Sequence, residues 1–164
     1  MNRNFIAFFV IFSVFSSTSL AEESVGASGL KLPRFVSLSA KTANLRTGPG
    51  THYPIRWTYK RRGHPLQIIE EHEHWRKVRD HDKVEGWILK NLLYGPRRAM
   101  IHSKTRPLYS KNDLASDVLL IVEKGVTGSV VECSGIWCRL DVDGTKAWIE
   151  RRHLWGVLPN EEID

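Results

Sequence analysis

The chain has few cysteines, no long apolar stretch beyond its first residues and no recognisable phosphate-binding glycine pattern. Only 2 of its 164 residues are cysteine. The glycine-rich stretch Asn44–Pro54 lacks the lysine and the following Ser or Thr of a Walker loop. It also lacks the third glycine of a dinucleotide-binding turn. These absences exclude the common nucleotide-binding classes and leave the glycine stretch to be explained by the fold.

The N-terminal residues have the three-part pattern of a secretory signal peptide. Arg3 supplies a basic start, Phe5–Phe15 is a short apolar run, and Ser19 and Ala21 are small residues at the cleavage-determining positions. This run is much shorter than the roughly 20 apolar residues that cross a bilayer. We therefore expect cleavage between Ala21 and Glu22, and an exported protein, periplasmic or secreted, with no membrane span in the mature chain.

Export would place the two cysteines in an oxidising compartment. Cys133 and Cys138 stand in a turn-forming context with four residues between them, so a hairpin would bring them opposite each other. Two cysteines without nearby histidines make a poor metal site, and a thiol nucleophile requires a general base. The favoured interpretation is a structural disulfide.

An internal repeat divides the rest of the chain into two units. Trp75–Val78 recurs as Trp137–Leu140, and Gly86–Ile88 recurs as Ala147–Ile149, at separations of 62 and 61 residues. The sequence therefore predicts five segments: a signal peptide at 1–21, a linker at 22–34, a first domain at 35–94, a second domain at 99–157 and a tail at 158–164.

Each unit has the pattern of short strands. Apolar residues alternate with polar ones between clusters of Gly, Asp and Ser, and no helical stripe follows the signal peptide. About five short strands in so small a unit must close on themselves to bury a face, which predicts a small barrel.

Two motifs in the first unit resemble those of the bacterial SH3 domain family. Asn44–Gly50 reads N-L-R-T-G-P-G, similar to the family's N-[VL]-R-x-G-P stretch, and Gly86–Ile88 matches its G-W-[VI] triplet. The second unit keeps Ala147–Ile149 but reads Arg106–Lys111 in place of the loop motif, so it is degenerate. The resemblance implies an all-β fold of two tandem SH3-like small barrels. It also implies a binding role, with cell-wall peptides or proteins as the usual partners.

The positive charge of the chain lies in the first unit. Residues 31–98 contain 15 Lys and Arg against 6 Asp and Glu, a net of +9, whereas residues 99–164 contain 8 against 10, a net of −2. Such a surface attracts polyanions or simply keeps the protein in solution. The candidate partners are an anionic envelope polymer, a membrane surface or an acidic protein, with nucleic acid not expected for an exported protein. The predicted basic surface comprises Lys60, Arg61, Arg62, Arg76, Lys77 and Arg79.

Aromatic residues next to the glycine loop are the candidate ligand contacts, since Tyr and Trp are the usual anchors of binding surfaces. Trp57 and Tyr59 have no counterpart in the second unit. Trp87 and Trp148, at matching strand positions, are expected in the cores. The predicted ligand-binding residues are Arg46, Tyr53, Trp57, Tyr59 and Trp75.

No catalytic residue, metal site or cofactor is predicted. The cluster Glu71–His74 would need further ligands from His52, His64 or His81 to hold zinc, and no catalytic triad or carboxylate pair can be placed. The predicted function is that of an exported, non-enzymatic binding or adaptor protein for peptidoglycan peptides or an envelope protein. The alternative is a secreted regulator or host-facing factor that acts only through protein contacts.

Overall fold

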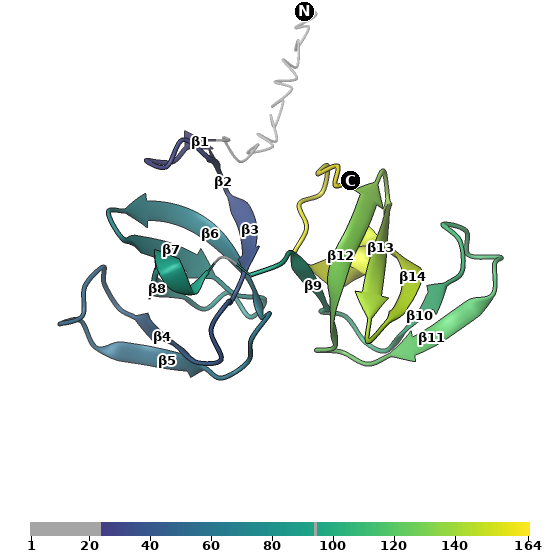
Figure 1. The fold of residues 1–164 in the computed structure, drawn as a ribbon, viewed down its shortest axis with the longest axis horizontal. Helices are drawn as coiled ribbons and strands as arrows, with labels where there is room; N and C mark the ends of the chain where they lie inside the picture. Colours follow the sequence, from purple (N-terminus) through teal and green to yellow (C-terminus); the bar gives the residue numbers. More distant parts are fainter. Residues whose placement is uncertain (1–23, 94) are drawn as a thin grey trace, which may run out of the picture.

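The computed structural model describes residues 24–93 and 95–164. The predicted signal peptide, with its cleavage point between Ala21 and Glu22, lies outside the described residues. Within the described ranges, no helix has the length and apolar character needed to cross a membrane. The chain folds as two β units that lie side by side, joined through a short connection before β9 (Figure 1).

The first unit is one antiparallel sheet curled into a small barrel. Its strands follow the order β3-β6-β7-β8-β4-β5, and the first and last strands are edges. A single 3-10 turn, η1, follows β8. The bounds are β3 Arg34–Ser37, β4 Ala43–Arg46, β5 Ile55–Tyr59, β6 Pro65–His72, β7 Trp75–Arg79, β8 Glu85–Leu89 and η1 Lys90–Leu92.

The second unit repeats this topology. Its order is β11-β10-β14-β13-β12-β9-β15, which is the order of the first unit with one short strand, β15, added beside β9. The all-β fold and its division into two similar units are thereby confirmed. The bounds are β9 Arg98–Ile101, β10 Arg106–Tyr109, β11 Val118–Val122, β12 Thr127–Ser134, β13 Trp137–Val142, β14 Thr145–Glu150, η2 Arg151–His153 and β15 Leu154–Trp155.

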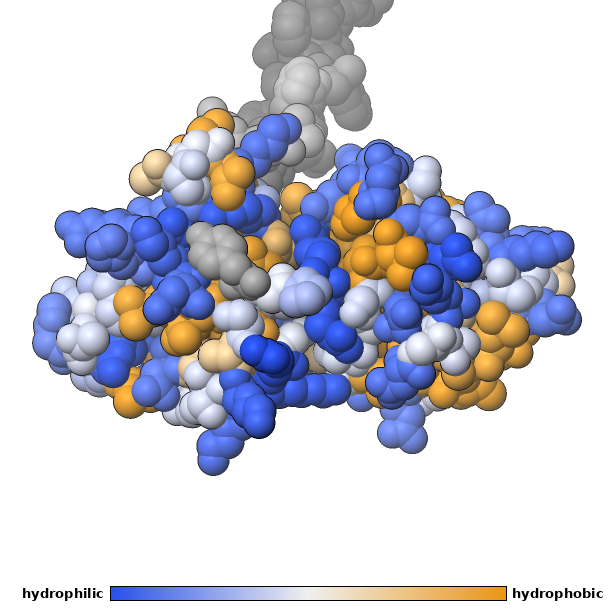
Figure 2. Space-filling model, in the orientation of Figure 1, coloured by the Kyte–Doolittle hydropathy of each residue, from blue (hydrophilic) through white to orange (hydrophobic). Residues whose placement is uncertain are grey.

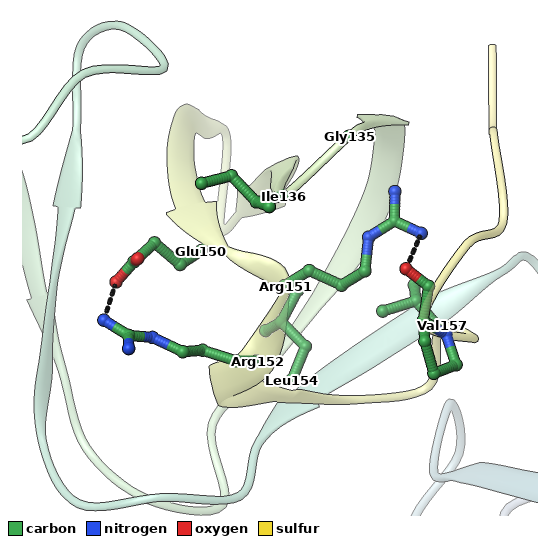
Figure 3. Close-up of a pocket in the computed structure, with 8 residues that line it drawn as sticks. Gly135, Ile136, Glu150, Arg151, Arg152, Leu154 and Val157 are labelled. Atoms are coloured by element: carbon green, nitrogen blue, oxygen red, sulfur yellow. Dashed lines mark hydrogen bonds and ion pairs between the residues drawn. The ribbon is translucent and has the colours of Figure 1, made fainter.

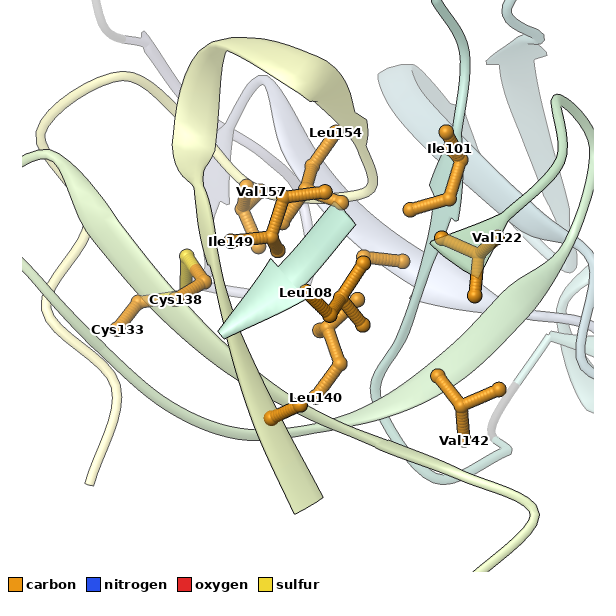
Figure 4. Packing of buried hydrophobic residues seen from close by; sticks show 12 residues of the cluster. Ile101, Leu108, Val122, Cys133, Cys138, Leu140, Val142, Ile149, Leu154 and Val157 are labelled. Atoms are coloured by element: carbon orange, nitrogen blue, oxygen red, sulfur yellow. A yellow bond between two sulfur atoms is a disulfide. The ribbon is translucent and has the colours of Figure 1, made fainter. Parts of the chain in front are cut away.

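Each unit has its own apolar core. In the first unit, Leu45, Ile68 and Ile88 are fully buried from three different strands. In the second, Leu108, Leu140 and Ile149 play the same part, as Figure 4 shows. Because successive side chains of a strand point to opposite faces, these residues all point inward. The alternation of apolar and polar residues in the sequence therefore accounts for the two cores.

The two units pack on each other. The ring of Phe35 in β3 meets the ring of Trp155 in β15 edge-on, with centroids 4.9 Å apart. The indole nitrogen of Trp155 donates to the carbonyl of Pro65 over 3.2 Å, and Arg61 Nη1 donates to the carbonyl of Gly125 over 3.0 Å. These contacts fix one barrel against the other.

Within the segment predicted as a linker, the described residues form a small hairpin, with strands β1 (Ser24–Val25) and β2 (Lys31–Leu32). The hairpin is held by Glu71 of β6, whose carboxylate accepts hydrogen bonds from Ser28 N over 2.7 Å and Ser28 Oγ over 2.8 Å. A Cβ on Gly26 would lie 2.7 Å from Glu71 Oε2, so a side chain here would push the carboxylate of Glu71 out of its hydrogen bonds. The sequence shows no local sign of this attachment because the partner is 43 residues away.

The disulfide between Cys133 and Cys138 is confirmed. The two residues are directly opposite each other in β12 and β13, and both are buried. Cys133 also pairs through its backbone with Ile163, which attaches the C-terminal tail to the same hairpin.

Replacing both cysteines by alanine should lower the stability of the second unit by about 2 kcal/mol, because the cross-link restricts the unfolded chain. Urea unfolding of the variant and the parent, followed by tryptophan fluorescence, measures the difference. The parent in reductant should resemble the variant, and reductant should leave the variant unchanged. Equal stability of the parent and the variant would contradict a stabilising role.

Candidate functional site

An exposed apolar strip lies along β5, at the edge of the first barrel. Trp57 is 57% exposed, Ile55 51% and Tyr53, in the preceding loop, 38%. β5 pairs only with β4, so its outer backbone edge has no neighbouring strand within the barrel. Large exposed aromatic and aliphatic side chains beside an unpaired strand edge are typical of a protein-binding surface.

The glycine loop positions this strip. Arg46 Nη1 donates to the carbonyl of Tyr53 over 2.7 Å, and Thr47 N donates to the carbonyl of Pro54 over 3.0 Å, which closes the loop at its base. A Cβ on Gly48 would lie 2.5 Å from the ring of Tyr53. A side chain at this position would push the tyrosine ring away, so the glycine lets Tyr53 pack closely against the loop.

A small groove of about 150 Å³ lies behind the loop and brings together two of the predicted ligand residues, Arg46 and Trp75. Asn44 and Thr51 supply polar walls. Trp75 is only 8% exposed, so it lines the groove from the core and does not project from the surface.

Tyr59, predicted as a ligand contact, is buried inside the first barrel and does not belong to the exposed strip. The residue is 6% exposed, and its hydroxyl donates to Asp80 Oδ2 over 2.9 Å. The ring of His64 stacks on it at a centroid distance of 5.0 Å. Burial, together with the charge of Asp80 and the hydrogen bond to it, raises the pKa of the Tyr59 hydroxyl, so it remains a neutral donor inside the barrel.

The predicted basic surface is not one surface. Arg76 is buried at 5% exposure and pairs with Glu71 over 3.2 Å, which corrects its assignment as a surface cation. Lys77 pairs with Glu70 over 3.3 Å and Arg79 with Glu85 over 2.7 Å. In the loop before β6, Lys60 is exposed, Arg62 Nε donates to the carbonyl of Ser39 over 2.6 Å, and Arg61 reaches across to the second barrel. Most of these cations are therefore engaged within the protein.

Of the two tryptophans that were expected in the cores, only one is buried. Trp87 is buried at 8% exposure, whereas Trp148 is half-buried with the guanidinium of Arg139 5.9 Å from its ring centre. Over residues 24–93 and 95–164, no group of three or more His, Cys, Asp or Glu side chains is arranged to hold a metal ion.

A larger groove, of about 520 Å³, lies in the second barrel and was missed by the sequence reasoning. The groove is lined by Gly135 and Ile136 at the β12–β13 turn, by Arg151 in η2, and by Val157 and Pro159 of the tail. In Figure 3 the side chain of Arg151 extends from η2 toward Val157. These residues come from three separate segments, so no single stretch of sequence could have indicated them.

The second barrel also exposes apolar side chains on its edge strand. Val118, Leu119 and Ile121 of β11 are 51%, 46% and 74% exposed. In Figure 2 apolar residues gather at the lower right, over β10 and β11. β11 occupies the place in this sheet that β5 occupies in the first, so both barrels present an apolar edge.

A sequence model of the bacterial SH3 domain matches the chain twice, at residues 39–95 and 102–156. The chain belongs to this family of binding domains, as two tandem copies. No curated protein matches the chain.

Solved structures similar to the chain include three NlpC-type proteins. They are NlpC2 from Trichomonas vaginalis (13% identity, TM-score 0.35, 75% of this chain and 48% of that one), an NlpC/P60 family protein from Bacillus cereus ATCC 10987 (13%, 0.35, 74% and 55%) and NlpC1 from T. vaginalis (12%, 0.38, 88% and 50%). The chain spans about half the length of these proteins.

Proposed function

We propose that the chain is an exported, non-enzymatic binding protein whose first barrel recognises cell-wall peptides or an envelope protein. The observation that carries the proposal is the exposed strip of Tyr53, Ile55 and Trp57 along the edge of β5. Membership of a family of binding domains supports it. The signal-peptide pattern at 1–21 supports export to the periplasm or beyond.

The edge of β5 offers two kinds of contact to an extended peptide. Its unpaired backbone groups can hydrogen-bond to a peptide strand, and Trp57 supplies an apolar anchor of low entropy cost. Arg46 lines the groove behind the loop and also holds the carbonyl of Tyr53. A ligand group that enters this groove would therefore contact Arg46, the residue that also holds the loop carrying Tyr53.

The internal pairing of the cations favours this peptide-binding mode over the attraction of polyanions. Arg76, Lys77 and Arg79 each have an acidic partner within 3.3 Å. The charge of these three side chains is thus compensated locally, which reduces their own part in counterion release, while the net charge of +9 over residues 31–98 is unchanged.

Trp57→Ala should weaken sedimentation of the mature chain with purified cell-wall sacculi by roughly tenfold or more, the effect of losing an interface hot spot. The melting temperature should change little because the side chain is 57% exposed. Ile121→Ala, which truncates an exposed residue of the second barrel, is the matched control and should bind as the parent does.

A salt series separates this proposal from the alternatives. Binding that persists at high salt and depends on Trp57 supports recognition by the strip. Binding that salt abolishes equally in parent and variant overturns it in favour of nonspecific charge attraction. If the protein does not bind sacculi, an envelope protein is the remaining proposed ligand. A pull-down that uses the parent and Trp57→Ala as baits tests this.

A further inference from the structure

The groove of the second barrel has an apolar lining and a rigid frame. Ile136, Leu154, Val157 and Pro159 contribute most of its walls. The tail that forms one side is fixed, because Ile163 pairs with Cys133 in both directions of the backbone, at 2.8 and 3.0 Å. The disulfide-linked hairpin on one side and the anchored tail on the other thus frame the groove.

The floor of this groove contains a buried guanidinium that is satisfied on one side only. The side chain of Arg151 is 6% exposed. Its Nη1 donates to the carbonyls of Leu158, Pro159 and Glu161 over 2.8, 3.0 and 2.7 Å. Its Nε and Nη2 are buried and have no hydrogen-bond partner among the residues that the structure describes. Figure 3 shows the bonded nitrogen directed at the tail, with the other two away from it.

A buried cation with unused donors lowers its free energy by binding an anion. The Nε and Nη2 groups of an arginine form the flat edge that a carboxylate matches with two parallel hydrogen bonds. The three carbonyl oxygens accept hydrogen bonds from Nη1 only, and they carry no full negative charge. A carboxylate is therefore the group that would satisfy both nitrogens at once.

The carboxylate that the protein itself offers is poorly placed. Within the described chain, Glu162 is the acidic residue within 4.0 Å of Arg151, and its Oε1 lies at that full distance from Nη2. This atom already accepts a hydrogen bond from Gly135 N over 3.1 Å, and the side chain is 61% exposed. Glu162 is thus a weak internal competitor for the two buried nitrogens, and a ligand that pairs with them must also shift the side chains that cover them.

The geometry points to a second binding site, in which the groove takes a carboxylate attached to a short aliphatic group, as at the C-terminus of a peptide that ends in an aliphatic residue. The carboxylate pairs with Nε and Nη2 of Arg151, and the aliphatic group packs between Ile136 and Val157. At the other end of the groove Arg152 neutralises Glu150 over 2.7 Å, so the acidic group there does not repel the ligand. This site is independent of the strip on the first barrel.

The test uses N-acetyl-leucine as the carboxylate probe and N-acetyl-leucinamide as its uncharged match, titrated into the full mature chain and followed by amide NMR shifts. N-acetyl-leucine should bind with a roughly millimolar dissociation constant, the range for so small a ligand, with shifts centred on Gly135, Ile136 and Val157. The amide should bind about tenfold more weakly or worse, since it loses a charge-assisted contact. Equal binding of the two probes, or shifts centred elsewhere, would overturn the proposal, as would no shift at all.

Substitutions at exposed positions test the ligand contact without disturbing the fold. Ile136→Asp places a negative charge at an exposed rim position and should abolish binding, whereas Ile121→Asp, equally exposed on β11, should not. Glu162→Gln keeps an acceptor for Gly135 N but removes the competing charge, so affinity should rise several-fold. Affinity that is unchanged in Ile136→Asp, or that falls in Glu162→Gln, contradicts the assignment.

Discussion

Replacing Glu71 by glutamine should destabilise the first barrel by about 3–5 kcal/mol, the effect of removing one partner from a buried ion pair. The side chain of Glu71 is 1% exposed, and its Oε1 lies 2.6 Å from Arg34 Nη2 and 3.2 Å from Arg76 Nε. Without the negative charge, two largely buried guanidinium groups face each other with no counter-ion. The N-terminal hairpin should loosen as well, because Ser28 is held by the same carboxylate.

The ionisation of Glu71 is secured by its hydrogen bonds. Burial alone would raise the pKa of the carboxyl, but donors from Arg34 and Ser28 outweigh it and lower the pKa to about 2 from an ordinary 4.5. A depressed pKa means that the stabilisation is complete above pH 4.5 and is lost as the pH falls toward 2. The glutamine variant should therefore lose the pH dependence of the parent in this range.

Urea unfolding followed by tryptophan fluorescence measures the change, and Glu70→Gln is the matched control. Glu70 is the neighbouring residue, with 54% of its side chain exposed and a 3.3 Å pair to Lys77, so its loss should change stability by about 1 kcal/mol or less. Hydrogen exchange at the Ser28 amide should accelerate in Glu71→Gln only. Similar effects of the two substitutions would contradict the central role given to Glu71.

A sequence signal for the Glu71–Arg76 pair does exist. The two residues flank a tight turn at Glu73–His74, and the register of β6 and β7 places them directly opposite each other. Cross-strand pairs of opposite charge are a standard feature of hairpins. What the sequence cannot show is that Arg34 and the hairpin around Ser28 cover this pair, which turns a surface pair into a buried one.

The exposure of Trp57 and the burial of Tyr59 could not both be predicted from strand alternation. Both residues have the same phase in β5, so strand alternation gives them the same face. Only the end that carries Tyr59 meets the turn at Asp80 and the ring of His64, whereas Trp57 lies at the open edge. The repeat, the short strands and the disulfide follow from local patterns. The burial of Tyr59 depends on a segment 21 residues away.

The polar cluster around Tyr59 should make the first barrel sensitive to mild acid. Burial, reinforced by the nearby charge of His81, lowers the pKa of His64 to about 4 from 6.5, although Asp80 acts in the opposite direction. His64 Nε2 is buried without a hydrogen-bond partner, so a proton there would gain no acceptor in the fold. The unfolded chain takes up this proton near pH 6.5, and the folded chain only near pH 4.

Stability contributed by a neutral His64 is therefore complete above pH 6.5 and falls as the pH approaches 4, by about 3 kcal/mol in total. His64→Phe keeps a ring to stack on Tyr59 and removes the titration, so its urea midpoint should vary much less between pH 7 and pH 4. His74→Phe, at an exposed turn position, should retain the slope of the parent. This window lies above that of Glu71, so the two groups can be told apart: acid first removes the contribution of His64 and only then that of Glu71. A slope between pH 7 and 4 that survives in His64→Phe would assign the sensitivity to another group.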